Sequence, residues 1–276
     1  MDPSYPAAAP TCFRHPDRPT RLACSECGRF ICVECSRDAV VGQKCPDCTT
    51  PEHRTRVIPA RTITQPRRTA TPVTWALIGI CVAVFALDYL PSLDIAFRAA
   101  QSTALVEQGQ WWRLVTAMFL HQNTLHLAFN MYALWLFGPV LERRFGAPSF
   151  VALYIAGGVS GGMLFQLLEQ NAVAVGASGA IFGLLGALLA ASYRQRHTRA
   201  GAAAFTQLGL LLAINLALPL FWPNIAWQAH VGGLVAGILI AAVWDRMPLP
   251  GRAAVWRRVA VALVVGGAAL LVVLLT

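Results

Sequence analysis

The chain has 276 residues, of which 56% are hydrophobic and 13% are charged, and its formal net charge at pH 7 is +9. Soluble domains carry about 25% charged residues, so this composition excludes an ordinary soluble protein and indicates an integral membrane protein. Residues 1–72 are polar, basic and rich in proline, whereas most of the remaining chain is apolar, so we expect two parts.

Cysteines concentrate near the N-terminus. Four pairs of metal-ligand residues occur there, each with two residues between its members: Cys12 and His15, Cys24 and Cys27, Cys32 and Cys35, and Cys45 and Cys48. Eight such ligands fill two tetrahedral zinc sites, so residues 10–50 are predicted to form a zinc-binding domain with two structural zinc ions. Disulfide bonds are the alternative, but they need an oxidising compartment and leave His15 without a role.

The next segment, residues 51–72, contains several prolines among threonines and arginines. This composition predicts a flexible basic linker.

Seven apolar segments follow the linker, and each has the length of roughly 17 to 25 residues that a membrane-spanning helix needs. They cover residues 73–90, 115–138, 149–168, 174–193, 205–222, 226–244 and 254–275. The first half of the second segment is interrupted by polar residues. The pattern predicts an all-α polytopic membrane protein.

Arginines are distributed unevenly between the connections. They occur before the first segment and after the second, fourth and sixth, whereas the connections after the third and fifth hold no Lys or Arg. Only the first connection, with Arg98 and Arg113, departs from this pattern. The positive-inside rule then predicts a cytoplasmic N-terminus and a C-terminus outside. This topology explains most of the net charge, so no nucleic-acid partner is expected, and it places the cysteines in a reducing compartment.

A few strongly polar side chains lie inside the predicted spans. Ser178 and His230 lie about five residues into the fourth and sixth segments, and His126 and Asn130 share one face of the second. Because these segments cross in the same direction, the four side chains should share a level roughly 5 to 15 Å below the outer surface. Polar groups are costly inside a membrane and often mark functional sites.

Each of these residues also has an ordinary explanation. A serine among glycines usually serves helix packing. A histidine inside a membrane belongs to a proton relay or lines a pore about as often as it serves catalysis. Their common depth on three helices instead favours an enzyme, with a hydroxyl nucleophile, an imidazole base and donors for an oxyanion. No span carries a deeply placed carboxylate and no HExxH sequence occurs, which disfavours an aspartyl protease, a zinc protease and a transporter.

The residues resemble the rhomboid family of intramembrane serine proteases over about residues 73–250. Five separate motifs carry the resemblance: GASG at Gly176–Gly179, AHVGG at Ala229–Gly233, His126 and Asn130 in HxxxN spacing, Trp112–Arg113, and Gly138, Glu142 and Arg144 in GxxxExR spacing. The resemblance implies a six-helix core at residues 73–250, with an additional seventh transmembrane helix at residues 251–276.

The resemblance also implies roles for the residues. Ser178 would be the nucleophile and His230 its general base, while the Ser178 N–H, His126 and Asn130 would stabilise the oxyanion. Many members of the family have tyrosine four residues after the serine, where this chain has Phe182, so a ring is kept and a hydroxyl is lost. The implied substrates are single-span membrane proteins in the lipid bilayer; the alternative is an inactive member that binds transmembrane clients.

The N-terminal pairs resemble a B-box-type cross-brace zinc finger, although Cys45 and Cys48 stand where that family has histidines. Cross-brace wiring would join the first pair to the third and the second to the fourth. Such a domain implies a cytosolic protein partner. The alanine- and arginine-rich composition, with a single lysine, is typical of a bacterium with a GC-rich genome, so we expect a bacterial plasma-membrane protein.

Overall fold

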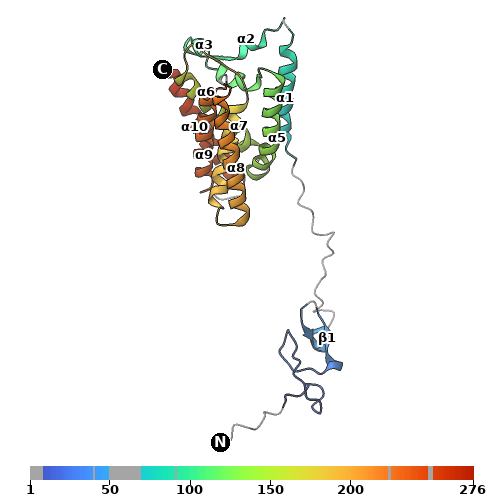
Figure 1. Ribbon diagram of the computed structural model, residues 1–276. Helices are drawn as coiled ribbons and strands as arrows, with labels where there is room; N and C mark the ends of the chain where they lie inside the picture. Colours follow the sequence, from blue (N-terminus) through green and yellow to red (C-terminus); the bar gives the residue numbers. More distant parts are fainter. Residues whose placement is uncertain (1–8, 40, 50–69, 91, 223–224, 248–250) are drawn as a thin grey trace. The chain divides into compact units, whose positions relative to one another are not determined.

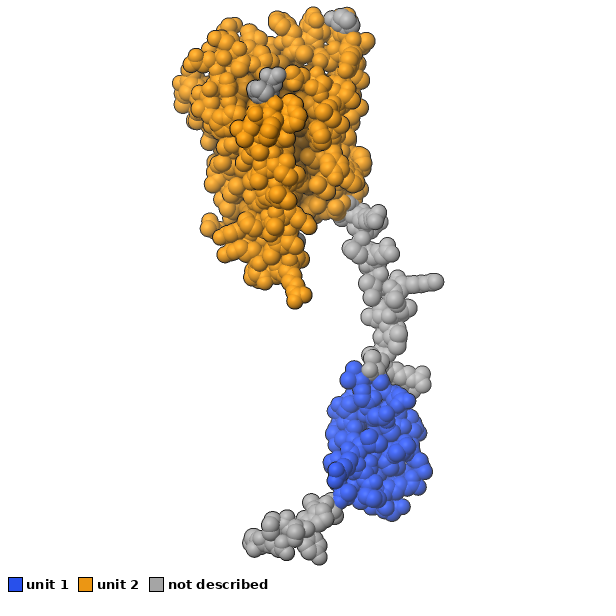
Figure 2. All heavy atoms as spheres, in the orientation of Figure 1, with its two compact units in different colours: residues 1–68 blue, residues 69–276 orange. Residues whose placement is uncertain are grey.

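The computed structural model describes residues 9–39, 41–49, 70–90, 92–222, 225–247 and 251–276. The chain divides into two compact units, residues 1–68 and 69–276 (Figure 2). Most of the linker predicted at residues 51–72 lies outside the described residues, and helix α1 begins at Pro72.

The described residues of the first unit, 9–39 and 41–49, contain little regular structure. A two-stranded antiparallel sheet pairs β1 (Arg37–Asp38) with β2 (Gln43–Lys44), and two short 3-10 helices, η1 (Val33–Cys35) and η2 (Pro46–Thr49), contain or precede cysteines. The buried apolar cluster consists of five cysteines and Ile31. Since one aliphatic side chain cannot form a sufficient core, the fold of this unit depends on links between its cysteine-containing segments.

The second unit is built from seven apolar helices (Figure 1). They are α1 (Pro72–Asp88), α5 (Thr124–Phe145), α6 (Ala147–Leu168), α7 (Ser178–Arg194), α8 (Arg199–Ala217), α9 (Trp227–Trp244) and α10 (Arg252–Leu275). Among the described residues, five helices are long and apolar enough to cross a membrane, α8 being extended by the 3-10 helix η6 (Leu218–Leu220); α1 and α7 are apolar helices of 17 residues. This architecture confirms the predicted fold class.

The prediction for the second span was wrong in its bounds. Residues 115–138 were expected, but α5 begins at Thr124 and ends at Phe145. Asn123 caps this helix, because its side chain accepts a hydrogen bond from the backbone N–H of His126 at 2.9 Å. The apolar residues before the cap form two short helices instead, α4 (Arg113–Thr116) and η5 (Ala117–Phe119).

The fourth span also begins later than residue 174. Val173 and Ala174 form strand β4, which pairs with β3 (Gln101–Ser102) of the first connection. That connection also contains the short helices α2 (Ile95–Ala99) and α3 (Thr103–Glu107). Its Arg113 is buried and donates to the carbonyl oxygens of Phe97 and Ala100 at 3.0 and 2.7 Å. Arg113 therefore serves the structure of this connection.

Helices α6, α7 and α9 pack with their backbones in contact. A Cβ atom added to Gly233 would lie 1.9 Å from the carbonyl oxygen of Gly179, and one added to Gly237 would lie 1.9 Å from that of Gly183. Gly183 also packs against Gly157 of α6, where an added Cβ would meet a Cα atom at 3.0 Å. Glycines at four-residue spacing thus allow the backbones of α7 and α9 to touch.

Charged side chains tie the helices together at the ends where α5, α7 and α9 finish. Glu142 of α5 is buried, and its carboxylate accepts hydrogen bonds of 2.7–3.0 Å from the backbone N–H groups of Val73 and Thr74 and from the Thr74 hydroxyl. A carboxylate at a helix N-terminus is favourable, so Glu142 caps α1. Asp245 at the end of α9 pairs with Arg144 at 3.6 Å and with Arg194 at 3.5 Å.

Candidate active site

Ser178 is the first residue of α7. The turn before it requires glycine at position 176, whose φ angle is +129°, and the Gly176 N–H donates to the Ala117 carbonyl oxygen at 2.9 Å. The N–H groups of a first helical turn have no partner within the helix, and the helix dipole is positive at this end. Ser178 thus combines a hydroxyl with a backbone donor suited to an oxyanion.

His230 is the fourth residue of α9 and is buried. The first turns of α7 and α9 are in contact, since a Cβ added to Gly179 would lie 3.4 Å from the Ala229 carbonyl oxygen. The ring of Phe182 stacks on the His230 imidazole with a centroid distance of 4.1 Å and an interplanar angle of 7°. Because Phe182 lies four residues after Ser178, this stacking holds His230 on the face of α7 that carries the serine.

Among the described residues, no hydrogen bond joins the Ser178 hydroxyl to His230, and Nδ1 of His230 has no partner. Hydrogen bonds of catalytic groups are often long without substrate and shorten in the Michaelis complex. The ring is therefore held by stacking and burial rather than by a carboxylate.

His126 also lies next to Ser178. A Cβ atom on Gly176 would lie 2.8 Å from Nε2 of His126 and 3.8 Å from Oγ of Ser178, so both side chains flank this glycine. Asn130 is buried one turn further along α5, and its amide nitrogen donates to the His126 carbonyl oxygen at 2.9 Å. The structure therefore gathers Ser178, His126 and His230 at the beginnings of three helices, with Asn130 bonded to its own helix.

These residues lie closer to the helix starts than the sequence indicated. Ser178 is the first helical residue rather than about the fifth, and His126 is the third residue of α5. Their depth in a bilayer remains a prediction. His121, which precedes α5, is buried, and its ring lies 5.2 Å from that of His126.

A small cavity adjoins Ser178. It has a volume of about 30 Å³ and is lined mainly by glycine, alanine and other apolar residues. Among the described residues, Gln101 of β3 supplies the one other polar side chain of its wall. Gln101 could not be identified from the sequence, because only the pairing of β3 with β4 brings this residue of a connection beside the serine.

The N-terminal ligand pairs form two clusters. One contains Cys12, His15, Cys32 and Cys35, and the other contains Cys24, Cys27, Cys45 and Cys48, with all ligand atoms of a cluster within 4.8 Å of one another. The first pair therefore meets the third and the second meets the fourth, which is the cross-brace arrangement.

The distances within the clusters suit zinc. Tetrahedral ligation with Zn–S bonds of about 2.3 Å separates two sulfurs by about 3.8 Å. The sulfurs of Cys27 and Cys45 are 3.8 Å apart, and Nδ1 of His15 lies 3.4 Å from the sulfurs of Cys32 and Cys35. Burial raises the pKa of the Cys12 thiol, but backbone hydrogen bonds from Arg14 and Cys32 outweigh burial and lower the pKa to about 6. Burial raises the pKa of Cys35 in the same cluster to about 11, so all the thiolates of the cluster would be present together only with metal bound.

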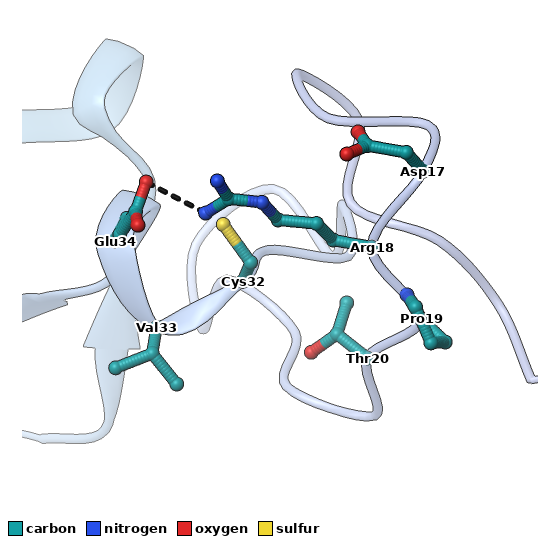
Figure 3. Close-up of a pocket in the computed structure, with 7 residues that line it drawn as sticks. All are labelled: Asp17, Arg18, Pro19, Thr20, Cys32, Val33 and Glu34. Carbon is teal, nitrogen blue, oxygen red and sulfur yellow. Dashed lines mark ion pairs between the residues drawn. The ribbon is translucent and has the colours of Figure 1, made fainter.

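A shallow cleft of about 520 Å³ lies beside the first cluster, between residues 17–20 and 32–34 (Figure 3). Arg18 and Glu34 form an ion pair of 2.6 Å across it. Both side chains are well exposed, so this pair contributes little stability. It links the loop after His15 to the segment that carries the third ligand pair.

Models of known protein families match both parts of the chain. Residues 108–246, half of the chain, match the model of the rhomboid domain, and residues 8–39 match that of the B-box zinc finger. The B-box match ends before Cys45 and Cys48, so it leaves out half of the second cluster.

Three relatives illustrate the similarity. The chain is 41% identical over 150 residues to "Rhomboid protease GluP" of Bacillus subtilis (54% of this chain, 29% of the relative). It is 35% identical over 148 residues to "RHOMBOID-like protein 6, mitochondrial" of Arabidopsis thaliana (53% and 48%). It is 37% identical over 137 residues to "Putative rhomboid protease YdcA" of Bacillus subtilis (49% and 68%). The chain thus spans less than half the length of the first two.

Proposed function

Because this chain belongs to the rhomboid family of multi-pass membrane proteins, we propose that it is an intramembrane serine protease with Ser178 and His230 as its catalytic dyad. Its substrates would be single-span membrane proteins, cut in or near their transmembrane segments. The observation that carries the proposal is the convergence of Ser178, His126 and the stacked His230 at three helix starts.

The chemistry follows from these positions. Oγ of Ser178 attacks the peptide carbonyl carbon while His230 takes the hydroxyl proton. The resulting oxyanion accepts hydrogen bonds from the Ser178 N–H and from His126, and Asn130 supports it through its bond to the His126 backbone. The tetrahedral intermediate then releases the amine, which receives the proton from His230, and leaves an ester on Ser178. Water hydrolyses this ester in a second step.

The alternative is an inactive family member that binds transmembrane clients. The two functions are distinguished by incubating the purified full chain, reconstituted in liposomes, with a labelled single-span membrane protein. The proposal expects two fragments and covalent labelling of Ser178 by a fluorophosphonate. Binding of the substrate without either product would favour the client-binding function.

Phe182 offers a test of how the base is held. Phe182→Leu removes the stacked ring, and an aromatic contact of this kind contributes about 0.5–1.5 kcal/mol. We expect kcat to fall by up to about tenfold, with KM nearly unchanged, because the substrate does not depend on this ring for binding. Phe182→Tyr is the control, since it keeps the ring and should retain wild-type kcat. An unchanged kcat in Phe182→Leu would show that burial alone orients His230.

We propose that the two N-terminal clusters each hold one structural zinc ion. Elemental analysis of the full chain in reducing buffer should return two zinc ions per chain, and Cys24→Ser should return one, because it removes a ligand from the second cluster only. Because zinc competes with protons for its cysteine and histidine ligands, the metal content should stay at two per chain at neutral pH and fall as the solution is acidified. A metal content near zero at pH 7 would contradict this assignment.

We further propose that the zinc-binding unit lies in the cytoplasm of a bacterium, where it binds a protein partner, and that the C-terminus lies outside the plasma membrane. The arginines in the last turns of α5 and α7, with Arg246 shortly after α9, support this orientation. Digestion of the zinc-binding unit by protease added to inside-out vesicles, but not to right-side-out cells, is the expected result; the opposite pattern would reverse the topology.

A further inference from the structure

The second N-terminal cluster carries more negative charge than the first when both hold zinc. Its ligands are the four thiolates of Cys24, Cys27, Cys45 and Cys48, whereas His15 replaces one thiolate in the first cluster. Four thiolates around Zn²⁺ leave a larger negative charge than three thiolates with a neutral imidazole. The thiolates of the second cluster therefore repel one another more strongly, and a neighbouring cation would offset this repulsion.

Arg29 supplies such a cation. Its Nε donates to the sulfur of Cys27 at 3.3 Å, and its Nη2 donates to the sulfur of Cys45 at 3.6 Å. These two sulfurs are 3.8 Å apart and belong to the second and fourth ligand pairs. One guanidinium group therefore bonds to both pairs that must meet at the second zinc ion. Its donors form a fixed planar fork, which the ammonium group of lysine does not have.

Two further contacts hold the Arg29 side chain in place. Its Nη2 pairs with a carboxylate oxygen of Asp47 at 3.0 Å, and its guanidinium carbon lies 4.3 Å from the centre of the Phe13 ring. Asp47 belongs to η2 beside the fourth ligand pair, and Phe13 follows Cys12 of the first cluster. The Arg29 side chain is 43% exposed, so solvent screens part of its charge. Contacts on two sides nevertheless leave it little conformational freedom to lose when it bonds to the sulfurs.

We propose that Arg29 is a positioning residue of the second zinc site, an inference that rests on the proposed zinc binding. Its two hydrogen bonds to sulfur offset the negative charge of the four thiolates and hold the second and fourth ligand pairs at the spacing that zinc requires. Hydrogen bonds with a charged donor are about twice as strong as those between neutral groups. Without Arg29 the second zinc ion leaves sooner, while the first ion stays.

Arg29→Met tests this role, because methionine is also long and unbranched but has no charge and no hydrogen-bond donor. Arg14→Met is the matched control. Arg14 also pairs with Asp47, at 2.5 Å, and also lies against the Phe13 ring, at 5.7 Å, but in the described part of the chain its side chain forms no hydrogen bond to a ligand sulfur. The measurement is the rate at which the full chain, in detergent and reducing buffer, releases zinc to an excess of a chromogenic chelator.

From Arg29→Met we expect one zinc ion to leave about tenfold faster than from the wild type. Loss of a group that orients metal ligands typically costs about 10- to 100-fold in metal affinity, and the exposure of Arg29 places it at the lower end of this range. The other ion should leave at the wild-type rate, as should both ions of Arg14→Met. Cys24→Ser assigns the ions, because it should hold only the first one. Adding Arg29→Met to Cys24→Ser should leave the release of that ion unchanged.

Arg29→Lys keeps the charge but loses the fork, so its second ion should leave more slowly than that of Arg29→Met and faster than that of the wild type. If Arg29→Met does not fold, the comparison of Arg29→Lys with the wild type replaces it.

Release of both ions at the wild-type rate from the folded Arg29 variants would overturn the positioning role, as would an equal acceleration in Arg14→Met. Failure of the proposed zinc binding looks different, because the wild-type chain would then contain no zinc to release.

Discussion

Replacing Ser178 by alanine should reduce cleavage of a single-span substrate by at least about 10³-fold, since removal of a serine nucleophile costs this much or more in other serine hydrolases. The fold should survive, because the Ser178 side chain makes no hydrogen bond to any described residue and alanine is a good helix former. The measurement is cleavage in liposomes, with the melting temperature in detergent recorded in parallel.

His230→Ala should cause a loss of similar size, because without the base the hydroxyl stays protonated. Ser160→Ala is the matched control: Ser160 is a buried serine of α6 whose hydroxyl has no hydrogen-bond partner in the described part of the chain, and it does not line the cavity at Ser178. It should retain activity. Cleavage by Ser178→Ala at the wild-type rate would assign the nucleophile to another group.

Gly237→Ala should be strongly destabilising, as should Gly233→Ala, because each adds a methyl group where two helix backbones touch. The Cβ added at Gly237 would lie 1.9 Å from the carbonyl oxygen of Gly183, a backbone atom that cannot rotate away. Helices α7 and α9 would have to separate, at a cost of about 1–3 kcal/mol or more. Because these two helices carry Ser178 and His230, activity should fall together with stability.

Gly267→Ala in α10 is the control for this effect, since no atom lies within 4 Å of the position of its Cβ. Both variants add one methyl group to an apolar helix, so lipid solubility and helix propensity change equally. Thermal unfolding in detergent should show a lower melting temperature for Gly237→Ala only. Equal stability of the two proteins would mean that α7 and α9 adjust without loss.

Much of the membrane unit could be predicted from the sequence, because hydropathy identifies the apolar helices and arginines occur at the helix ends predicted to be cytoplasmic. The second span was wrong because an apolar run does not reveal whether it lies in lipid or in protein. Residues 115–119 are as apolar as a span, yet Ala117 and Met118 are buried in short helices. The cap at Asn123 could have corrected the boundary, since asparagine before a helical pattern is a start signal.

Only part of the candidate site could be predicted from the sequence. The proximity of Ser178, His126 and His230 was predicted from spacing and common depth, which depend on helix geometry. The position of Gln101 was not, because it follows from a two-residue strand pairing between distant connections. A strand of two residues is too short to show an alternating apolar pattern, so it cannot be recognised in the sequence.

The ion pairs of Asp245 with Arg144 and Arg194 stabilise the helix packing at a distance from Ser178. Arg194 and Ser178 stand at opposite ends of α7, which at 17 residues is about 25 Å long. Glu142, Arg144 and Asp245 therefore hold the helices together far from Ser178. Substitutions at the Asp245 end can therefore change the stability of the helix packing without altering the residues around Ser178. Stability and reactivity depend on opposite ends of the same helix.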